Sequence, residues 1–111
     1  MEIARSIFLL LRGKKMRGEH SLLVCYDIAD KKRLHKVERI TEGFGYRIQD
    51  SVFFCRSSHL LQAILIQKIS NVINNKEDQF IIIDLGTDEN ILEQATVLGK
   101  KIINFPKITF I

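Results

Sequence analysis

The sequence has little of the residues that interrupt regular structure. It contains a single proline and six glycines in 111 residues. This scarcity argues against a low-complexity or disordered chain, and 46% hydrophobic with 27% charged residues is ordinary for a globular protein. A chain of this length is the size of one domain and leaves no room for a second.

Cysteine is also scarce. Cys25 and Cys55 both lie in apolar, strand-like runs without CxxC spacing. The three histidines, His20, His35 and His59, are scattered rather than clustered. The sequence therefore suggests neither a disulfide framework nor a zinc site, and we expect two reduced, packed thiols in a cytoplasmic protein.

Long hydrophobic runs are absent as well. The apolar run Ile7–Leu11 has five residues between basic neighbours, whereas a secretory core needs roughly 7 to 15 and a spanning helix about 20. We therefore expect no association with a membrane. Residues 1–18 are interpreted as a basic N-terminal extension or, because Met16 can itself begin the protein, as a mis-assigned start. Residues 19–111 are interpreted as a single domain.

Strand-like and helix-like segments follow one another along this domain. The expected strands are Ser21–Ile28, one bent or two separate strands within Tyr46–Arg56, Gln79–Leu85, and Lys101–Ile111 with Pro106 at a sheet edge. The expected helices are Lys31–Glu42 after an Asp30 N-cap, Ser57 or Ser58 to about Asn74, and a short one from Thr87 or Asp88 to about Leu98. This order predicts an α+β ferredoxin-like sandwich, with both helices on one face of an antiparallel sheet.

Two of the expected strands are apolar at consecutive positions, in Leu22–Cys25 and Phe80–Ile83. Such runs are typical of strands that are covered on both faces. A lone sandwich of this kind leaves one sheet face in solvent, and no further element is available to cover it. We therefore infer a homodimer in which the sheets pack face to face.

Asp27 is a carboxylate at the end of an otherwise apolar strand. It either accepts hydrogen bonds from the next turn or binds a metal ion. Magnesium prefers one or two carboxylates together with waters and phosphate oxygens, and a two-fold axis would supply Asp27 of the partner chain. An ion shared in this way would polarise a phosphodiester and activate a water, with no histidine required.

Positive charge lies close to Asp27. The formal net charge is +4, which favours polyanionic partners such as nucleic acid. The first turns of the expected helix carry four cations, Lys31, Lys32, Arg33 and Lys36. They form either a solvated helix face or a set of contacts to nucleic-acid phosphates.

Arg47, Gln49 and Ser51 alternate with Ile48 and Val52, which places these three polar side chains on one face if the strand is straight. Arg47 then either clamps a scissile phosphate through two hydrogen bonds or pairs with Asp50 or Asp27. Asp50 in turn either joins the metal site or neutralises Arg47.

Three segments at fixed intervals, Val24–Ile28 (VCYDI), Lys32–Val37 (KRLHKV) and Arg47–Phe53 (RIQDSVF), resemble the CRISPR-associated protein 2 family. The resemblance covers roughly Leu22 to Leu85. It implies a ferredoxin-like homodimer with exchanged C-terminal strands, which belongs to the machinery that captures foreign DNA as new spacers. Family members are described as magnesium-dependent endonucleases on RNA or DNA, and as dimeric bridges between integrase dimers.

The resemblance also implies roles for individual residues. By position, Asp27 is similar to the family's paired metal-binding aspartate, and Tyr26, Arg47, Ser51 and Phe53 match residues near its active cleft. We therefore expect Asp27, Arg47 and Ser51 to be catalytic, with Asp27 binding Mg²⁺. We expect Tyr26 and Phe53 to contact nucleic acid together with the four helix cations.

Three functions are compatible with these observations. The first is a metal-dependent nuclease, and the second is a non-catalytic DNA-binding scaffold that bridges integrase subunits. The third, outside the family, is a sandwich that stacks single-stranded RNA on aromatic residues of an exposed sheet face. The third is disfavoured because Tyr26, Phe53 and Phe80 lie in runs that look covered.

Overall fold

The structure is a computed structural model in which residues 18–100 are described. The expected N-terminal extension, apart from Gly18, and the expected strand Lys101–Ile111 lie outside the described residues. Within the described part of the chain, no helix is long and apolar enough to cross a membrane.

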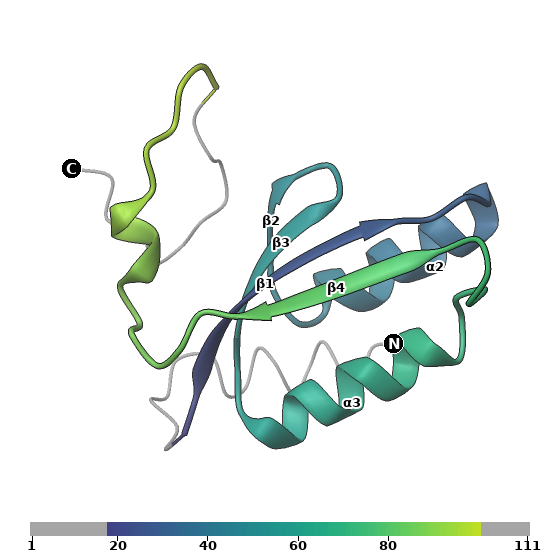
Figure 1. Cartoon of the computed structure of the whole chain (residues 1–111), viewed down its shortest axis with the longest axis horizontal. Helices are drawn as coiled ribbons and strands as arrows, with labels where there is room; N and C mark the ends of the chain where they lie inside the picture. Colours follow the sequence, from purple (N-terminus) through teal and green to yellow (C-terminus); the bar gives the residue numbers. More distant parts are fainter. Residues whose placement is uncertain (1–17, 101–111) are drawn as a thin grey trace.

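A four-stranded antiparallel sheet packs against two helices (Figure 1). In chain order the elements are β1 His20–Asp27, α2 Lys31–Glu42, β2 Tyr46–Gln49, β3 Val52–Ser57, α3 His59–Ser70, β4 Gln79–Asp84 and the 3-10 helix η1 Ile91–Gln94. The strands lie in the order β2-β3-β1-β4, and each neighbouring pair is antiparallel. The predicted ferredoxin-like α+β sandwich is thereby confirmed.

One face of the sheet forms the core with the two helices. Leu22, Val24 and Tyr26 occupy alternate positions of β1 and are buried. Val37 of α2 and Leu65 of α3 belong to the same buried cluster. Because strand residues alternate between faces, these contacts identify the side of the sheet that faces the helices.

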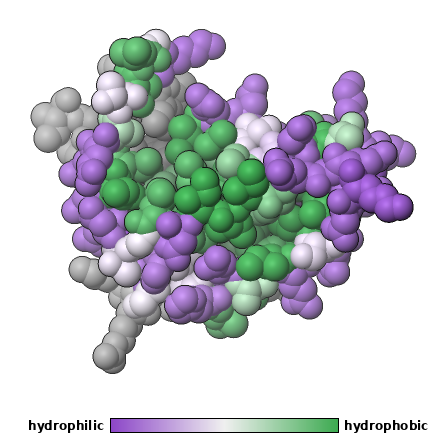
Figure 2. Space-filling model, viewed as in Figure 1, coloured by the Kyte–Doolittle hydropathy of each residue, from purple (hydrophilic) through white to green (hydrophobic). Residues whose placement is uncertain are grey.

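The opposite side of the sheet, hereafter the outer face, is also apolar. Leu23 pairs with Ile83, and Cys25 pairs with Ile81, in the register of β1 with β4. Ile81 and Ile83 are exposed. Figure 2 shows hydrophobic side chains gathered over the strands, bordered by hydrophilic ones. Within residues 18–100 nothing covers this face of β4, so the predicted cover by a second copy of the chain stays a prediction.

The segment Tyr46–Arg56 forms two strands rather than one bent strand, with Asp50 and Ser51 in the turn between them. The pairing of β2 with β3 shifts between Arg47 and Gln49, so that Arg47 lies opposite Phe53 and Gln49 opposite Val52. Phe53 and Val52 are successive residues and face opposite sides of the sheet. The prediction that Arg47, Gln49 and Ser51 share one strand face is therefore wrong.

The helix after β3 begins as predicted and ends earlier. Ser58 is its N-cap and accepts a hydrogen bond from the Leu61 amide at 3.2 Å. The helix stops at Ser70 instead of continuing to about Asn74. Asn74 opens a turn, because its carbonyl accepts from the Asp78 amide at 2.8 Å and its own amide donates to the Asp78 carboxylate.

The helix expected from Thr87 or Asp88 to about Leu98 is represented only by η1, Ile91–Gln94. None of the residues of η1 is buried. Short helices depend on the packing of an apolar face for their stability. The residues of η1 bury no such face, which explains why a longer helix does not form.

Candidate metal and nucleic-acid site

Asp27 is exposed at the end of β1, on the outer face of the sheet. Its backbone pairs with Gln79 of β4. The nearby amides that it was expected to bind have other partners: the Ala29 amide donates to Asp78, and the Arg33 amide donates to Asp30. Asp27 is therefore not the acceptor for the turn that follows it, and within residues 18–100 its carboxylate makes no hydrogen bond.

Asp27 alone can provide only part of a magnesium site. The described part of the chain contains no group of three His, Cys, Asp or Glu residues that could hold a metal ion. Mg²⁺ nevertheless keeps several waters and is often held by one or two carboxylates. Asp27, which is exposed and makes no hydrogen bond within residues 18–100, therefore fits as one ligand of a hydrated ion, and a complete site would need a further ligand.

Arg47 is engaged by partners on the helix side of the sheet. Its guanidinium donates to Glu38 Oε2 at 2.7 Å and to the Asp50 carbonyl at 2.8 Å, and lies 5.1 Å from the centre of the Phe53 ring. The hydrogen bond to Glu38 raises the pKa of Arg47 above its ordinary value. Arg47 therefore connects the β2–β3 turn to α2. It does not form the alternative ion pair with the carboxylate of Asp50 or Asp27.

The β2–β3 turn itself lies beside the end of β1. The Ser51 carbonyl accepts a hydrogen bond from the Tyr26 amide at 3.1 Å. Asp50 is exposed, and Arg47 binds its carbonyl rather than its carboxylate. The structure thus brings Ser51 and Asp50 next to the strand end that carries Asp27, whereas the Arg47 side chain lies on the other face.

Three aromatic rings stack in the layer between sheet and helices. The Tyr26 ring lies 6.1 Å from Phe53 and 5.8 Å from Phe80, centroid to centroid. Tyr26 and Phe53 are buried, and burial is the main cause that raises the pKa of Tyr26 to about 12. This placement is at odds with the prediction that Tyr26 and Phe53 contact nucleic acid, and it also removes the basis for stacking RNA on these rings.

The four cations of α2 fall into two groups. Lys31, Lys32 and Lys36 are exposed. The Arg33 guanidinium instead donates to Asp78 at 2.8 Å and to Glu77 at 2.9 Å. Three of the predicted phosphate ligands are therefore available in the described chain, and Arg33 is occupied by carboxylates.

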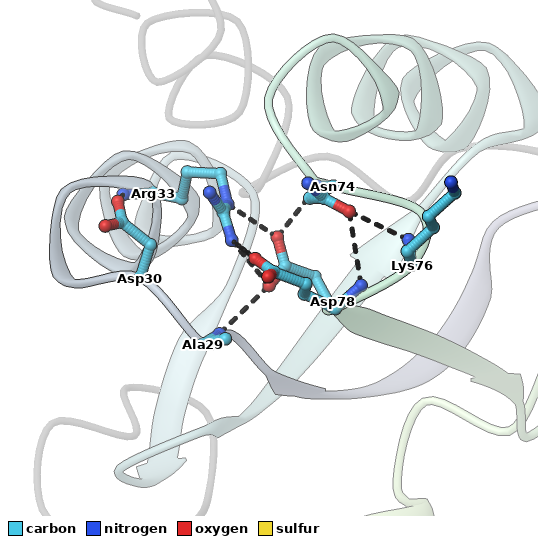
Figure 3. A network of polar contacts seen from close by, with 7 residues as sticks. Ala29, Asp30, Arg33, Asn74, Lys76 and Asp78 are labelled. Atoms are coloured by element: carbon cyan, nitrogen blue, oxygen red, sulfur yellow. Dashed lines mark hydrogen bonds and ion pairs between the residues drawn. The ribbon is translucent and has the colours of Figure 1, made fainter.

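Asp78 is a residue of this region that the sequence analysis missed. Its side chain is fully shielded from solvent and accepts hydrogen bonds from the Ala29 amide, the Asn74 amide and the Arg33 guanidinium (Figure 3). The hydrogen bond from Arg33 is the main reason that the pKa of Asp78 lies well below its usual range. An acidic residue directly before an apolar strand was the only indication in the sequence.

The low pKa of Asp78 predicts a specific loss of stability in acid. The folded chain binds fewer protons at this group than the unfolded chain, so its contribution is complete above the ordinary Asp pKa of about 3.9 and declines below it. We expect the difference in unfolding free energy between the wild type and Asp78→Asn to be constant from about pH 8 to 5 and to shrink below about pH 4. Urea unfolding at a series of pH values measures this difference, and a constant difference down to about pH 3 would contradict the expectation.

Known proteins resemble this chain in both sequence and fold. The sequence profile of the family described as CRISPR associated protein Cas2 matches residues 20–90. A relative from Geobacter sulfurreducens, named CRISPR-associated endoribonuclease Cas2, is 34% identical over 74% of this chain and 86% of its own length. A relative from Rhodospirillum rubrum, named CRISPR-associated endoribonuclease Cas2 1, is 32% identical over 78% of this chain and 85% of its own length.

Two solved structures have a similar fold. The crystal structure of Streptococcus pyogenes Cas2 at pH 6.5 superimposes with a TM-score of 0.64 and 27% identity, covering 71% of this chain and 99% of that one. The hypothetical protein TT1823 from Thermus thermophilus gives a TM-score of 0.66 and 28% identity, covering 75% of this chain and 94% of that one. The chain described here therefore belongs to the CRISPR-associated Cas2 family.

Proposed function

We propose that this chain is a magnesium-dependent endoribonuclease that works as a homodimer in CRISPR spacer acquisition. The observation that carries the proposal is the exposed Asp27 carboxylate on the apolar outer face of the sheet, which has no hydrogen-bond partner among residues 18–100. The relatives from Geobacter sulfurreducens and Rhodospirillum rubrum are named endoribonucleases, which supports RNA as a substrate.

A face-to-face dimer would make the partial site complete. The exposed Ile81 and Ile83 pair with Cys25 and Leu23 of β1. Asp27 is two positions beyond Cys25 on the same strand, so all three side chains lie on the outer face. An apolar face of this kind favours burial against an equally apolar surface. A two-fold axis through this face would direct the Asp27 carboxylates of both chains toward a common ion.

The chain's own residues then have separate tasks. Asp27 holds the ion, and the exposed Lys31, Lys32 and Lys36 bind the phosphates on either side of the scissile bond without reading sequence. When bound, the ion supplies Lewis-acid polarisation of the phosphodiester and a water of lowered pKa. Ser51 lies in the turn beside the end of β1, where its carbonyl accepts from the Tyr26 amide, and its proposed task is to contact the ribose or phosphate.

A second function is favoured by the contacts of Arg47. Its guanidinium is occupied by Glu38 and a backbone carbonyl, so it does not present a free phosphate clamp. A protein that keeps Asp27 but lacks that clamp would serve as a non-catalytic scaffold, with the exposed lysines holding duplex DNA between integrase subunits. The two functions thus differ in their partners: the nuclease binds RNA, whereas the scaffold binds duplex DNA and integrase.

Metal removal separates the two functions. The purified chain is incubated with labelled single-stranded RNA, duplex RNA and duplex DNA, with Mg²⁺ or with EDTA. We expect cleavage of RNA with Mg²⁺ and none with EDTA, because the bound ion would polarise the phosphodiester and lower the pKa of the attacking water. Retention of labelled duplex DNA without cleavage of any substrate would instead identify the scaffold, and equal cleavage with EDTA would contradict the role of the metal.

A further inference from the structure

The loop that follows Asp27 is fixed from a distant part of the chain. The Ala29 amide, two positions after Asp27, donates to Asp78 Oδ1 at 2.9 Å, across a separation of 49 residues. Ile28 between them is buried in the core. The chain leaving β1 therefore has its direction set by Asp78, in the α3–β4 connection.

The Asp78 carboxylate binds the loop and α2 at the same time. Oδ1 accepts from the Ala29 amide and from Arg33 Nη2 at 3.2 Å, while Oδ2 accepts from Arg33 Nε at 2.8 Å and from the Asn74 amide at 2.8 Å. An ionised carboxylate has about four acceptor positions, so these contacts use all of them. Figure 3 shows the carboxylate at the centre of the network, with Arg33 reaching it from α2.

The same segment also contacts Asp27 through the sheet. Asp78 directly precedes Gln79, and Gln79 pairs with Asp27 in the register of β4 with β1. The end of β1 is thus held on one side by its pairing with Gln79 and, two residues later, by the Asp78 carboxylate. Sites that bind metal ions need such support, because ligands must be held to within about 0.5 Å of their working positions.

We propose that Asp78, together with Arg33, is a positioning residue that orients Asp27 for metal binding. This inference rests on the proposed function of Asp27 as the metal ligand. It also assigns Arg33 to the support of the site rather than to phosphate binding. In a two-chain site the effect would be doubled, because each variant chain displaces its own Asp27.

Metal binding tests the proposal without relying on turnover. Mn²⁺, which takes the same oxygen ligands as Mg²⁺, is titrated into the full chain. The concentration of free Mn²⁺ is measured by electron paramagnetic resonance. We expect Asp78→Asn to weaken binding roughly tenfold or more, which is the usual effect of losing a residue that supports a metal ligand. Arg33→Lys, which keeps the charge but loses the forked hydrogen bonds, is expected to weaken binding as well, and it serves if Asp78→Asn folds poorly.

Glu19→Gln is the matched control. It removes a carboxylate that binds Arg56 at 3.1 Å next to the start of β1, at the opposite end of the strand from Asp27. We expect this variant to bind Mn²⁺ like the wild type. Equal affinity of Asp78→Asn and wild type, or an equal loss in Glu19→Gln, would overturn the proposal, and so would wild-type binding no stronger than that of Asp27→Ala.

RNA cleavage at increasing Mg²⁺ distinguishes this inference from the proposed function. We expect Asp78→Asn to need roughly tenfold more Mg²⁺ for half-maximal rate and to recover the wild-type rate at saturation. If the wild type binds Mn²⁺ but cleaves no RNA, the proposed nuclease function fails. The role of Asp78 is then still decided by the Mn²⁺ affinities of the wild type and Asp78→Asn. A wild type that cleaves RNA, with Asp78→Asn unchanged in both assays, would contradict only the positioning role.

Discussion

Replacing Asp27 by alanine is expected to lower the rate of Mg²⁺-dependent RNA cleavage roughly a thousandfold. Metal ions contribute several kcal/mol of transition-state stabilisation, and about 1.4 kcal/mol corresponds to a factor of ten in rate. Asp27 is the only side chain among those predicted to be catalytic that is exposed on the outer face, so in the proposed two-chain site its removal would leave the ion without an aspartate ligand from either chain. Single-turnover cleavage of labelled RNA measures the loss.

Asp30→Ser provides the matched control for this variant. Asp30 is an exposed carboxylate three residues from Asp27, and its side chain caps α2 by accepting from the Arg33 amide at 3.0 Å. Serine caps helices about as well as aspartate, so the helix is kept while the negative charge is removed. We expect Asp30→Ser to cleave at the wild-type rate. Equal cleavage by Asp27→Ala and the wild type would show that Asp27 is not needed for the reaction.

The secondary structure was predictable where the sequence carries local end signals. The helix Lys31–Glu42 is observed with the predicted bounds, because Asp30 supplies the N-cap and Gly43 the C-cap. The end of α3 was not predictable in the same way. Its apolar spacing continues through Val72 and Ile73, but Asn74 binds Asp78 and forms a turn, which depends on the approach of a later part of the chain.

Within the candidate site, the sequence singled out only Asp27, the proposed metal ligand. Asp27 stands out because it is a carboxylate at the end of an apolar strand, a property of neighbouring residues in the sequence. The partners of Arg47 and Arg33 depend on tertiary contacts, with Glu38 nine positions from Arg47 and Asp78 45 positions from Arg33. A single sequence does not show which carboxylate a given arginine will meet, so two expected phosphate ligands prove to have carboxylate partners.

Ile83→Lys is expected to convert the proposed homodimer into a monomer. Ile83 is 44% exposed in the single chain and lies on the outer face opposite Leu23. A face-to-face dimer would bury this position, and an ammonium group buried without a partner costs far more than the apolar contact it replaces. Light scattering at micromolar concentration should then give half the wild-type mass, with an unchanged circular dichroism spectrum showing that the fold is intact.

Ile66→Lys separates loss of the interface from the effect of an added charge. Ile66 lies on α3 and is 47% exposed, nearly the same as Ile83, but it belongs to the helical layer rather than to the outer face. We expect Ile66→Lys to remain dimeric and active, whereas Ile83→Lys should lose RNA cleavage together with dimerisation, because each monomer retains only one Asp27. A monomeric Ile83→Lys that still cleaves RNA at the wild-type rate would show that one chain suffices for the reaction, and a dimeric Ile83→Lys would show that the chains associate through another surface.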